Sequence, residues 1–465
     1  MSSIKYAGEV ELQKLILISS SGSAVDLTEL VISINIFESI FLNSMSGSIV
    51  IADTNNLVGN LPIIGQEYLR VKLNTPSLEE KSIDFSENVF VIYKIKARES
   101  DTQTQVLELQ FTSPEMLKSN RVRISKSYTD TIDNIVEDSL KNERYLDTSK
   151  DIFIEPTVGI RKMVVPNFHP YNLIKVLATE SISKEHSSSH YLFFENSRGI
   201  HFRSLQSLYK QGVTGKYHAG DKGATEKTTG LTNAGESGNL MQNMKRIISF
   251  SINTNNNTLI NIKNGMLGSK FISHDIYNKS YNVQTFGYFD NFKDDVRLSE
   301  NSVYNDNPID ENLNTVGSFT DARIHLHSVP SDVDTQHYNT ETSEYSYASN
   351  RLSDSLPSRQ SRIGELKNGI GLTMEVHGNT TVAAGDIINI QLPIAGKDHN
   401  NDKVDKYYSG DYIITDLRHI FVPRKREHSI IMSVAKDSIP ESLPKKSDAI
   451  QPKPQSKGQV IKQLY

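Results

Sequence analysis

The sequence has no cysteine and no tryptophan among its 465 residues. Without cysteine there is no disulfide framework, no thiolate zinc site, no iron–sulfur ligation and no cysteine nucleophile. Without tryptophan the chain lacks the strongest aromatic anchor for sugars and interfaces. No run approaches the ~18 apolar residues of a membrane-spanning helix, and the N-terminal segment has no apolar core of signal-peptide length. We therefore expect a soluble protein made in a cytoplasm, with no stable membrane association.

A large excess of charge of one sign is also missing. Lys and Arg number 50 against 55 Asp and Glu, which gives a formal net charge of −5. A basic field that would attract nucleic acid or an anionic membrane is therefore absent. Hydrophobic residues make up 37% of the chain, slightly less than in an average globular domain. At about 150 residues per domain, the length suggests about three domains.

Apolar residues alternate with other residues throughout the segment 1–112. Leu30, Ile32, Ile34 and Ile36 give one clear case, and the period of two is kept through at least five segments separated by turn-rich stretches. This pattern predicts an antiparallel sheet that is closed or sandwiched on itself. The same kind of alternation returns in residues 366–437.

Residues 113–245 are predicted to form an inserted α+β region. Apolar residues spaced at i, i+3, i+4 and i+8 over 132–140 predict one helix, and a second helix is expected to follow Pro170. A strand pair is expected over 191–202. Seven of the 26 glycines lie in 211–243, which is typical of a loop or linker that cannot carry a core.

The remaining segments are expected to connect or extend these units. Residues 246–285 read as strands that return to the second alternating region. Residues 286–365 are polar and are expected to form loops and small strands that extend the insertion. Residues 438–465 read as an extended tail, because the last 26 residues hold four prolines and five lysines.

Two pairs of strand-like segments repeat within the chain. Residues 67–73 match 386–392 class by class, and residues 90–96 match 412–418, in the same order and at nearly the same spacing. Either the chain contains two related β-barrels, or the match reflects only the pattern that any two antiparallel hairpins share. If the repeat is real, three chains would present six similar barrels with pseudo-sixfold symmetry.

Two stretches are similar to a known family. The first is IFESIFLNSMSGSIVIADTNNL at 36–57, followed by LPIIGQE at 61–67. The second combines VHGN at 376–379, AGD at 384–386 and GDYIITDLRH at 410–419. Together they resemble the baseplate hub protein of contractile-tailed bacteriophages, which is related to the base of the type VI secretion spike protein.

This resemblance implies a mainly β fold with an α+β insertion, in which two related tube-like antiparallel β-barrels occupy residues 1–112 and 366–437. It implies a homotrimer that adapts the sixfold tail tube to the threefold central spike and leaves a channel for DNA. The implied partners are the tail tube or its initiator, the spike and other baseplate proteins, with DNA only in passage. The implied location is the virion tail baseplate, after assembly in the host cytoplasm.

A few residues could in principle support chemistry. His325 and His327 share one strand face but have no third ligand nearby, so surface histidines are favoured over a metal site. His186 and His190 would chelate zinc on a helix, but the serines between them favour a loop. The stretch 220–228 lacks the spacing of a phosphate loop. We therefore expect no enzyme, no catalytic or metal site and no cofactor.

One apolar segment is a candidate interface. Phe37, Ile40, Phe41 and Leu42 continue an alternating strand without a polar break, so some of them are expected to seal against a neighbouring barrel. The alternative is a loop folded back onto its own core.

The tail is the second candidate interface. Its basic and apolar residues would suit docking on a partner, although a solvated tail is the more common outcome. The tail residues singled out are Lys445, Lys446, Leu464 and Tyr465.

Two other functions remain open. A carbohydrate-binding or adhesin-type tail protein would need an exposed aromatic platform, which the lack of tryptophan disfavours. A cell-wall hydrolase is less expected, because no catalytic motif is present.

Overall fold

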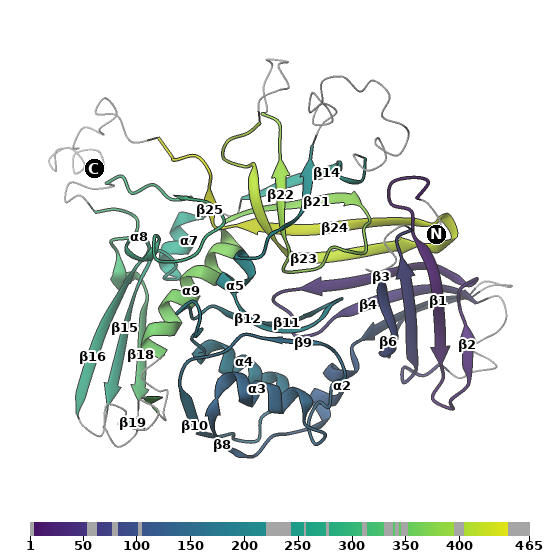
Figure 1. Ribbon diagram of the computed structural model, residues 1–465, viewed down its shortest axis with the longest axis horizontal. Coiled ribbons are helices and arrows are strands. Elements are labelled where there is room, and N and C mark those ends of the chain that lie inside the picture. Colours follow the sequence, from purple (N-terminus) through teal and green to yellow (C-terminus); the bar gives the residue numbers. More distant parts are fainter. Residues whose placement is uncertain are drawn as a thin grey trace, which may run out of the picture.

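The protein is mainly β and is built around one long sheet. In Figure 1 this sheet runs across the upper right, a helix-containing region lies below it, and a small sheet stands at the left. No helix among the residues described is long and apolar enough to cross a membrane. The computed structural model describes residues 4–53, 63–76, 82–100, 105–219, 243–254, 257–275, 279–308, 314–329, 338–339, 344–345, 352–394 and 404–444.

Seven strands form what we call the first half of the sheet, as the alternating pattern predicts. Their order in space is β3-β4-β7-β6-β5-β1-β2. Every second side chain, including Ile34, Ile49 and Leu109, is buried in one core on a single face. The strands are β1 (Glu11–Ile18), β2 (Ala24–Asp26), β3 (Val31–Ser39), β4 (Ser46–Asp53), β5 (Tyr68–Asn74), β6 (Ile83–Ser100) and β7 (Gln105–Thr112).

Six strands form the second half, around a separate core. Leu372, Met374 and Val434 are among its buried residues. Five strands follow the order β14-β21-β24-β23-β22, and β13 pairs with β22 in parallel. The strands are β13 (Val213–His218), β14 (Ile247–Thr254), β21 (Ile370–His377), β22 (Ile387–Gln391), β23 (Gly410–Val422) and β24 (Glu427–Lys436).

The pairing scheme repeats between the halves. In chain order β3, β4, β5, β6 and β7 pair as β3-β4-β7-β6-β5, and β14, β21, β22, β23 and β24 pair in the same way. The matching sequence segments fall on β5 and β22 and on β6 and β23. Because the topology repeats along with the pattern, an internal repeat explains the match better than a shared hairpin pattern does.

The two halves are joined into one sheet by their backbones. Residues 34–39 of β3 pair antiparallel with residues 416–421 of β23. The Ser39 hydroxyl donates to Asp416 Oδ1 at 2.6 Å. The path β14-β21-β24-β23-β3-β4-β7-β6 is therefore a run of eight antiparallel strands that crosses both halves.

The inserted region has its own core beneath the sheet. The two helices expected from the sequence are α3 and α4, and the expected strand pair is β11 and β12. Val136, Leu173 and Phe202 meet in this core. The elements are α2 (Pro114–Arg121), β8 (Ser127–Thr131), α3 (Ile132–Lys141), β9 (Ile152–Ile154), β10 (Ile160–Val164), α4 (Pro170–Glu180), β11 (Tyr191–Asn196), β12 (Gly199–Ser204) and α5 (Leu205–Tyr209).

Two expectations for the middle of the chain are wrong in part. Residues 213–218, predicted to be loop, form β13, whose Tyr217 is buried in the second core. Most other β13 side chains face outward, so the strand lacks an apolar signal. Residues 220–242 of the predicted loop lie outside the described residues. Of the segment 246–285, only β14 joins the second half.

The rest of that segment builds a separate small sheet. The hairpin of β15 (Gly268–Asp275) and β16 (Ser280–Gly287) is extended by β18 (Ile324–Val329). The 17-residue helix α9 (Leu352–Asn368) packs against it, where the polar sequence predicted only loops and small strands. Shorter elements are α7 (Thr258–Lys263), α8 (Tyr288–Asn291), β17 (Asn301–Ser302), β19 (Tyr338–Asn339), β20 (Glu344–Tyr345) and β25 (Ser438–Ile439).

Candidate subunit interface

The face of the eight-stranded sheet opposite the two cores is largely polar, and we call it the open face. Hydroxyl and amide groups alternate with a few charges and apolar groups on it. The Arg418 guanidinium lies over the Phe37 ring and hydrogen-bonds to Asn35 Oδ1 at 2.9 Å. One row across all eight strands reads Ser249, Glu375, Ile431, Arg418, Phe37, Ser46, Thr112 and Val91.

The eight-stranded run ends in two free edges. Pairing of β6 with β5 stops near Val91, and no described strand pairs with the other side of residues 93–100. The outer side of β14 likewise has no partner strand among the described residues. Large apolar side chains stand exposed on both edges, namely Tyr93 and Ile95 on β6 and Ile248, Phe250 and Ile252 on β14. Such edges are templates for pairing with another chain.

The candidate interface residues divide between surface and core. Phe37 (36% exposed) and Leu42 (55%) reach the surface. Ile40 is 1% exposed and packs in a core shared with Phe194 of the insertion and Ile413 of the second half, so it does not reach the surface. Phe41 is half-buried, with the Lys367 ammonium 4.8 Å from its ring centre. Lys445, Lys446, Leu464 and Tyr465 lie outside the described residues.

Two hollows flank Phe41 along one rim of the sheet. The hollow in the first half, which we call the rim groove, has a volume of about 570 Å³ and is lined in part by Leu42, Tyr93, Met116 and Leu117. The other, of about 270 Å³, lies in the second half beside Gly371 and Ala435 and is also lined by Phe41. Of these lining residues, Phe41 and Leu42 were predictable as an apolar interface segment, whereas the other walls come from distant parts of the chain.

The motifs that carry the family resemblance meet at one junction. Glu38 Oε1 accepts the Ser197 N–H at 3.0 Å, and Oε2 accepts the Ala384 N–H at 2.9 Å. The Asp386 carboxylate accepts two hydrogen bonds from Arg198, each of 2.7 Å. The junction thus ties β3, the β11–β12 turn and the loop before β22 together.

A glycine is required at this junction. Gly385 has a φ of +94°, and a Cβ there would lie 3.1 Å from the Phe194 ring. Only glycine combines this backbone conformation with so close an approach. The AGD motif therefore reflects packing of the insertion against the second half.

Burial sets the protonation of the junction carboxyl. Desolvation raises the pKa of Glu38 from 4.5 to about 7. His419 Nε2 lies 4.0 Å from Glu38 Oε1, and His419 Nδ1 is 3.0 Å from His428 Nε2. Desolvation lowers the pKa of His419 to about 3, so the imidazole is neutral near pH 7.

A pH dependence of stability follows from the raised pKa of Glu38. Because the folded state holds this proton more tightly, the stabilisation is complete below pH 4.5 and is lost as the pH rises to 7, by up to about 3 kcal/mol. Urea unfolding from pH 4.5 to 7.5 measures it. Buried histidines such as His419 contribute a stability that rises with pH over the same range, so the Glu38 effect is read from the difference between wild type and Glu38→Gln. The stability of the wild type relative to the variant should fall by up to about 3 kcal/mol between pH 4.5 and 7.5, and a constant difference would contradict the assignment to Glu38.

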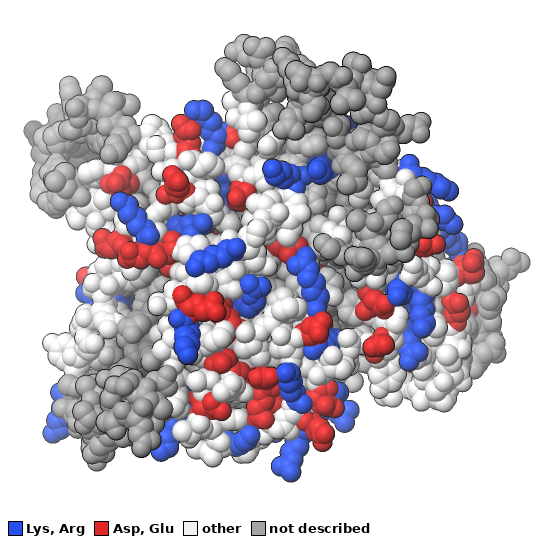
Figure 2. Space-filling view, in the orientation of Figure 1, with Lys and Arg blue, Asp and Glu red and all other residues white. Residues whose placement is uncertain are grey.

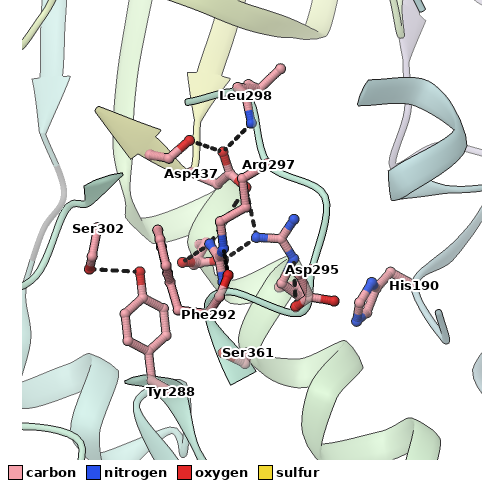
Figure 3. A network of polar contacts seen from close by, with 12 residues as sticks. His190, Tyr288, Phe292, Asp295, Arg297, Leu298, Ser302, Ser361 and Asp437 are labelled. Carbon is pink, nitrogen blue, oxygen red and sulfur yellow. Dashed lines mark hydrogen bonds and ion pairs between the residues drawn. The ribbon is translucent and has the colours of Figure 1, made fainter. Parts of the chain in front are cut away.

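A buried charge network fixes α9 and the segment between α8 and β17 to the second half (Figure 3). Arg362 Nη1 donates to Glu365 at 2.9 Å and to Asp437 at 2.7 Å. Arg297 Nη1 donates to both oxygens of Glu365 at 3.0 and 3.1 Å. All four side chains are at most 5% exposed. The two guanidinium groups keep the pKa of the Asp437 carboxyl below its usual range against desolvation, which acts in the opposite direction.

A second buried network fixes the insertion to the first half. Lys150 Nζ donates to Glu115 and Glu195, at 2.6 Å each. Glu195 also accepts the Met45 N–H at 3.0 Å and the Ser113 hydroxyl at 2.8 Å. Desolvation raises the pKa of Glu195, with Lys150 acting in the opposite direction.

The histidine pairs do not form a metal centre within the described part of the chain. No group of three or more His, Asp or Glu side chains there is placed to hold a metal ion. His325 and His327 stack on Phe271. His186 and His190 lie between α4 and β11 without helical structure, as predicted, and His190 Nε2 contacts the Ser358 hydroxyl at 2.8 Å.

Acidic and basic side chains are interspersed on the face in Figure 2, with no patch of one sign.

Comparisons with known proteins identify the fold. No protein-family model and no curated sequence matches the chain. The tail protein from Neisseria meningitidis has a TM-score of 0.50 at 10% identity, over 91% of this chain and 96% of that chain. The 43 kDa tail protein of prophage MuSo2 from Shewanella oneidensis has a TM-score of 0.49 at 10% identity, over 92% and 99%. An Escherichia coli type VI secretion component has a TM-score of 0.41 at 9% identity, over 92% and 77%.

The Neisseria similarity spans nearly the whole of both chains. The chain therefore has the fold of this tail protein, in agreement with the fold that the sequence resemblance predicts.

Proposed function

We propose that this chain, which has the fold of the Neisseria tail protein, is the structural hub of the baseplate of a contractile phage tail. Three copies form a ring of six similar β units that matches the sixfold tail tube to the threefold central spike. The ring encloses a channel for DNA. The protein then acts in the virion tail baseplate, is assembled in the host cytoplasm, and has no catalytic role.

The observation that carries this proposal is the join between the halves. By the repeated pairing scheme, β3 corresponds to β14 and β23 corresponds to β6. The chain pairs β23 with β3, but its own β6 and β14 lie at opposite ends of the eight-stranded run. Pairing β6 of one copy with β14 of the next would repeat the same join between chains.

Strand direction is compatible with this ring. Because eight strands alternate in direction, β6 and β14 run antiparallel, and rotation about a common axis keeps them antiparallel between copies. Three copies would close the run without a free edge, which removes the liability of exposed strands.

The side chains at the two edges also fit this pairing. Phe250 and Ile252 are opposite Met374 and Leu372, so they point to the core face, and Ile95 does so opposite Leu109. They are exposed because no further strand covers them. Joining the edges would bury these side chains in one continuous apolar layer.

The open face would line the channel. Its many hydroxyl and amide side chains have no charge, and the Arg418 guanidinium is held by Asn35 and Phe37. The exposed Lys94, opposite Gln110, shares the face with acidic residues such as Glu375. A wall of mainly neutral groups with charges of both signs offers little counterion release to a polyanion, so DNA would pass without being retained. The six-unit ring would contact the tail tube, and the spike and outer baseplate proteins would dock on threefold surfaces.

Light scattering of the full chain tests the ring. At micromolar concentration we expect a particle with three times the mass of the 52.2 kDa chain. Phe250→Asp places a charge on the β14 edge and should weaken trimerisation at least tenfold. The matched control is Tyr281→Asp, on an exposed aromatic residue of β16, which should stay trimeric. A wild-type chain that remains monomeric with added tube or spike protein would contradict the proposal.

A further inference from the structure

We propose that the rim groove receives the corner between β14 and α7 of a neighbouring copy of this chain, with Leu259 and Ile260 as the inserted side chains. The groove lies beside the free edge of β6, and the corner directly follows the free edge of β14. The proposal rests on the proposed ring and names the side chains that complete its interface.

The corner presents its apolar side chains on a fixed support. Leu259 is 80% exposed and Ile260 is 50% exposed. The Asn257 side chain caps α7 by accepting the Ile260 N–H at 3.1 Å. The buried Asn261 amide donates to the Tyr304 hydroxyl at 2.8 Å, so α7 is held from its inner side. Two large exposed apolar residues on a helix held in this way are typical of an interface rather than of a free surface.

The groove has the complementary chemistry. Leu42, Tyr93, Met116 and Leu117 all line it and are all substantially exposed. Polar groups lie around them, among them the Lys175 side chain. An apolar floor with a polar rim is the usual anatomy of a protein–protein interface.

The hollow in the second half is equivalent to the rim groove, and it shows which segment of the chain packs at such a position. In the match of 90–96 with 412–418, Tyr93 corresponds to Thr415 and Val91 to Ile413. Val91 pairs with Thr112 and Ile413 pairs with Ala435, so Thr112 is the equivalent of Ala435. Thr415 and Ala435 line the second-half hollow, and Phe41 lies against them. Phe41 belongs to the segment that follows β3.

That segment has an equivalent in the corner. The segment that follows β14, the counterpart of β3, is the β14–α7 corner. In the ring this corner would come from the next copy, and it would stand in the rim groove as Phe41 stands in the second half. Both hollows lie on the same rim, since Phe41 lines both and Asn253, near the end of β14, lines the second.

Cysteine cross-linking of the full chain tests the contact, because the chain has no native cysteine. In a double variant Leu117→Cys and Leu259→Cys, oxidation should link chains to one another into species of two and three chains on a non-reducing gel. The control pairs Leu117→Cys with Leu326→Cys, a residue of β18 with comparable exposure of 71%. This control should give at least tenfold less product.

The outcomes separate the groove contact from the ring. Cross-linking of the first pair alone, in a particle with the mass of three chains, supports both. A three-chain mass with no cross-link, or with equal yields from both pairs, overturns the groove contact and leaves the ring. A one-chain mass with no cross-link overturns both. As a second readout, Leu259→Asp should raise the dissociation constant of the trimer at least tenfold, and an unchanged constant overturns the contact.

Discussion

Replacing Arg362 by methionine is expected to lower the free energy of unfolding by about 3–5 kcal/mol. The Arg362 side chain is 1% exposed and donates to Glu365 and Asp437. Without it, one guanidinium, that of Arg297, remains for both buried carboxylates. The loss should shrink as the pH is lowered, because protonation of the two carboxylates removes the buried charge. Urea unfolding followed by far-UV circular dichroism measures it.

Two further variants test the cause of this loss. Arg144→Met changes an exposed arginine and should alter stability by less than about 0.5 kcal/mol. Adding Asp437→Leu to Arg362→Met should recover part of the loss, because it removes one of the carboxylates left behind. If the double variant is less stable than the single one, uncompensated charge is not the cause.

Replacing Lys150 by methionine should have a similar effect, about 3–5 kcal/mol. The Lys150 side chain, 5% exposed, stands between Glu115 and Glu195, and its loss would leave two buried carboxylates facing each other. Glu195 also holds the Met45 N–H and the Ser113 hydroxyl, so the attachment of the insertion to the first half should weaken with it.

A surface lysine gives the matched control for this variant. Lys141 pairs with Glu137 one helical turn away, and both side chains are about half exposed. Lys141→Met should therefore cost less than about 0.5 kcal/mol. Limited proteolysis gives an independent readout, since cleavage near residue 113 should speed up in Lys150→Met and not in Lys141→Met. Equal losses in the two variants would contradict the argument.

The strands and two of the helices were predictable because each buries one face, and this burial makes apolar residues recur at a regular spacing along the sequence. In β3 and β21 one face is buried, so apolar residues recur at every second position. The internal repeat was visible for the same reason. The helix α9 was not predictable, because charged groups such as Arg362 and Glu365 occupy its buried side and find their partners in distant segments.

The candidate interface was only partly predictable for a related reason. On α2 the buried residues are Glu115 and Ser119, while Met116 and Leu117 face outward into the rim groove. Apolar side chains are usually buried and carboxylates are usually exposed. On α2 the opposite holds, because the buried Lys150 ammonium pairs with the Glu115 carboxylate and keeps that side of the helix inside. The alternating residues of β14 predict a half-buried strand, but its place at a free edge depends on which strands lie beside it.

The join between β3 and β23 has a consequence for synthesis. Ser39 and its partner Asp416 are 377 residues apart. At about 5–20 residues per second, the ribosome releases β3 some 20–75 seconds before its partner strand. Throughout that time the nascent chain carries an open strand edge that invites pairing with other polypeptides. The elongation rate between these two strands, and the chaperones that reach the nascent chain, therefore determine how much of the protein folds rather than aggregates.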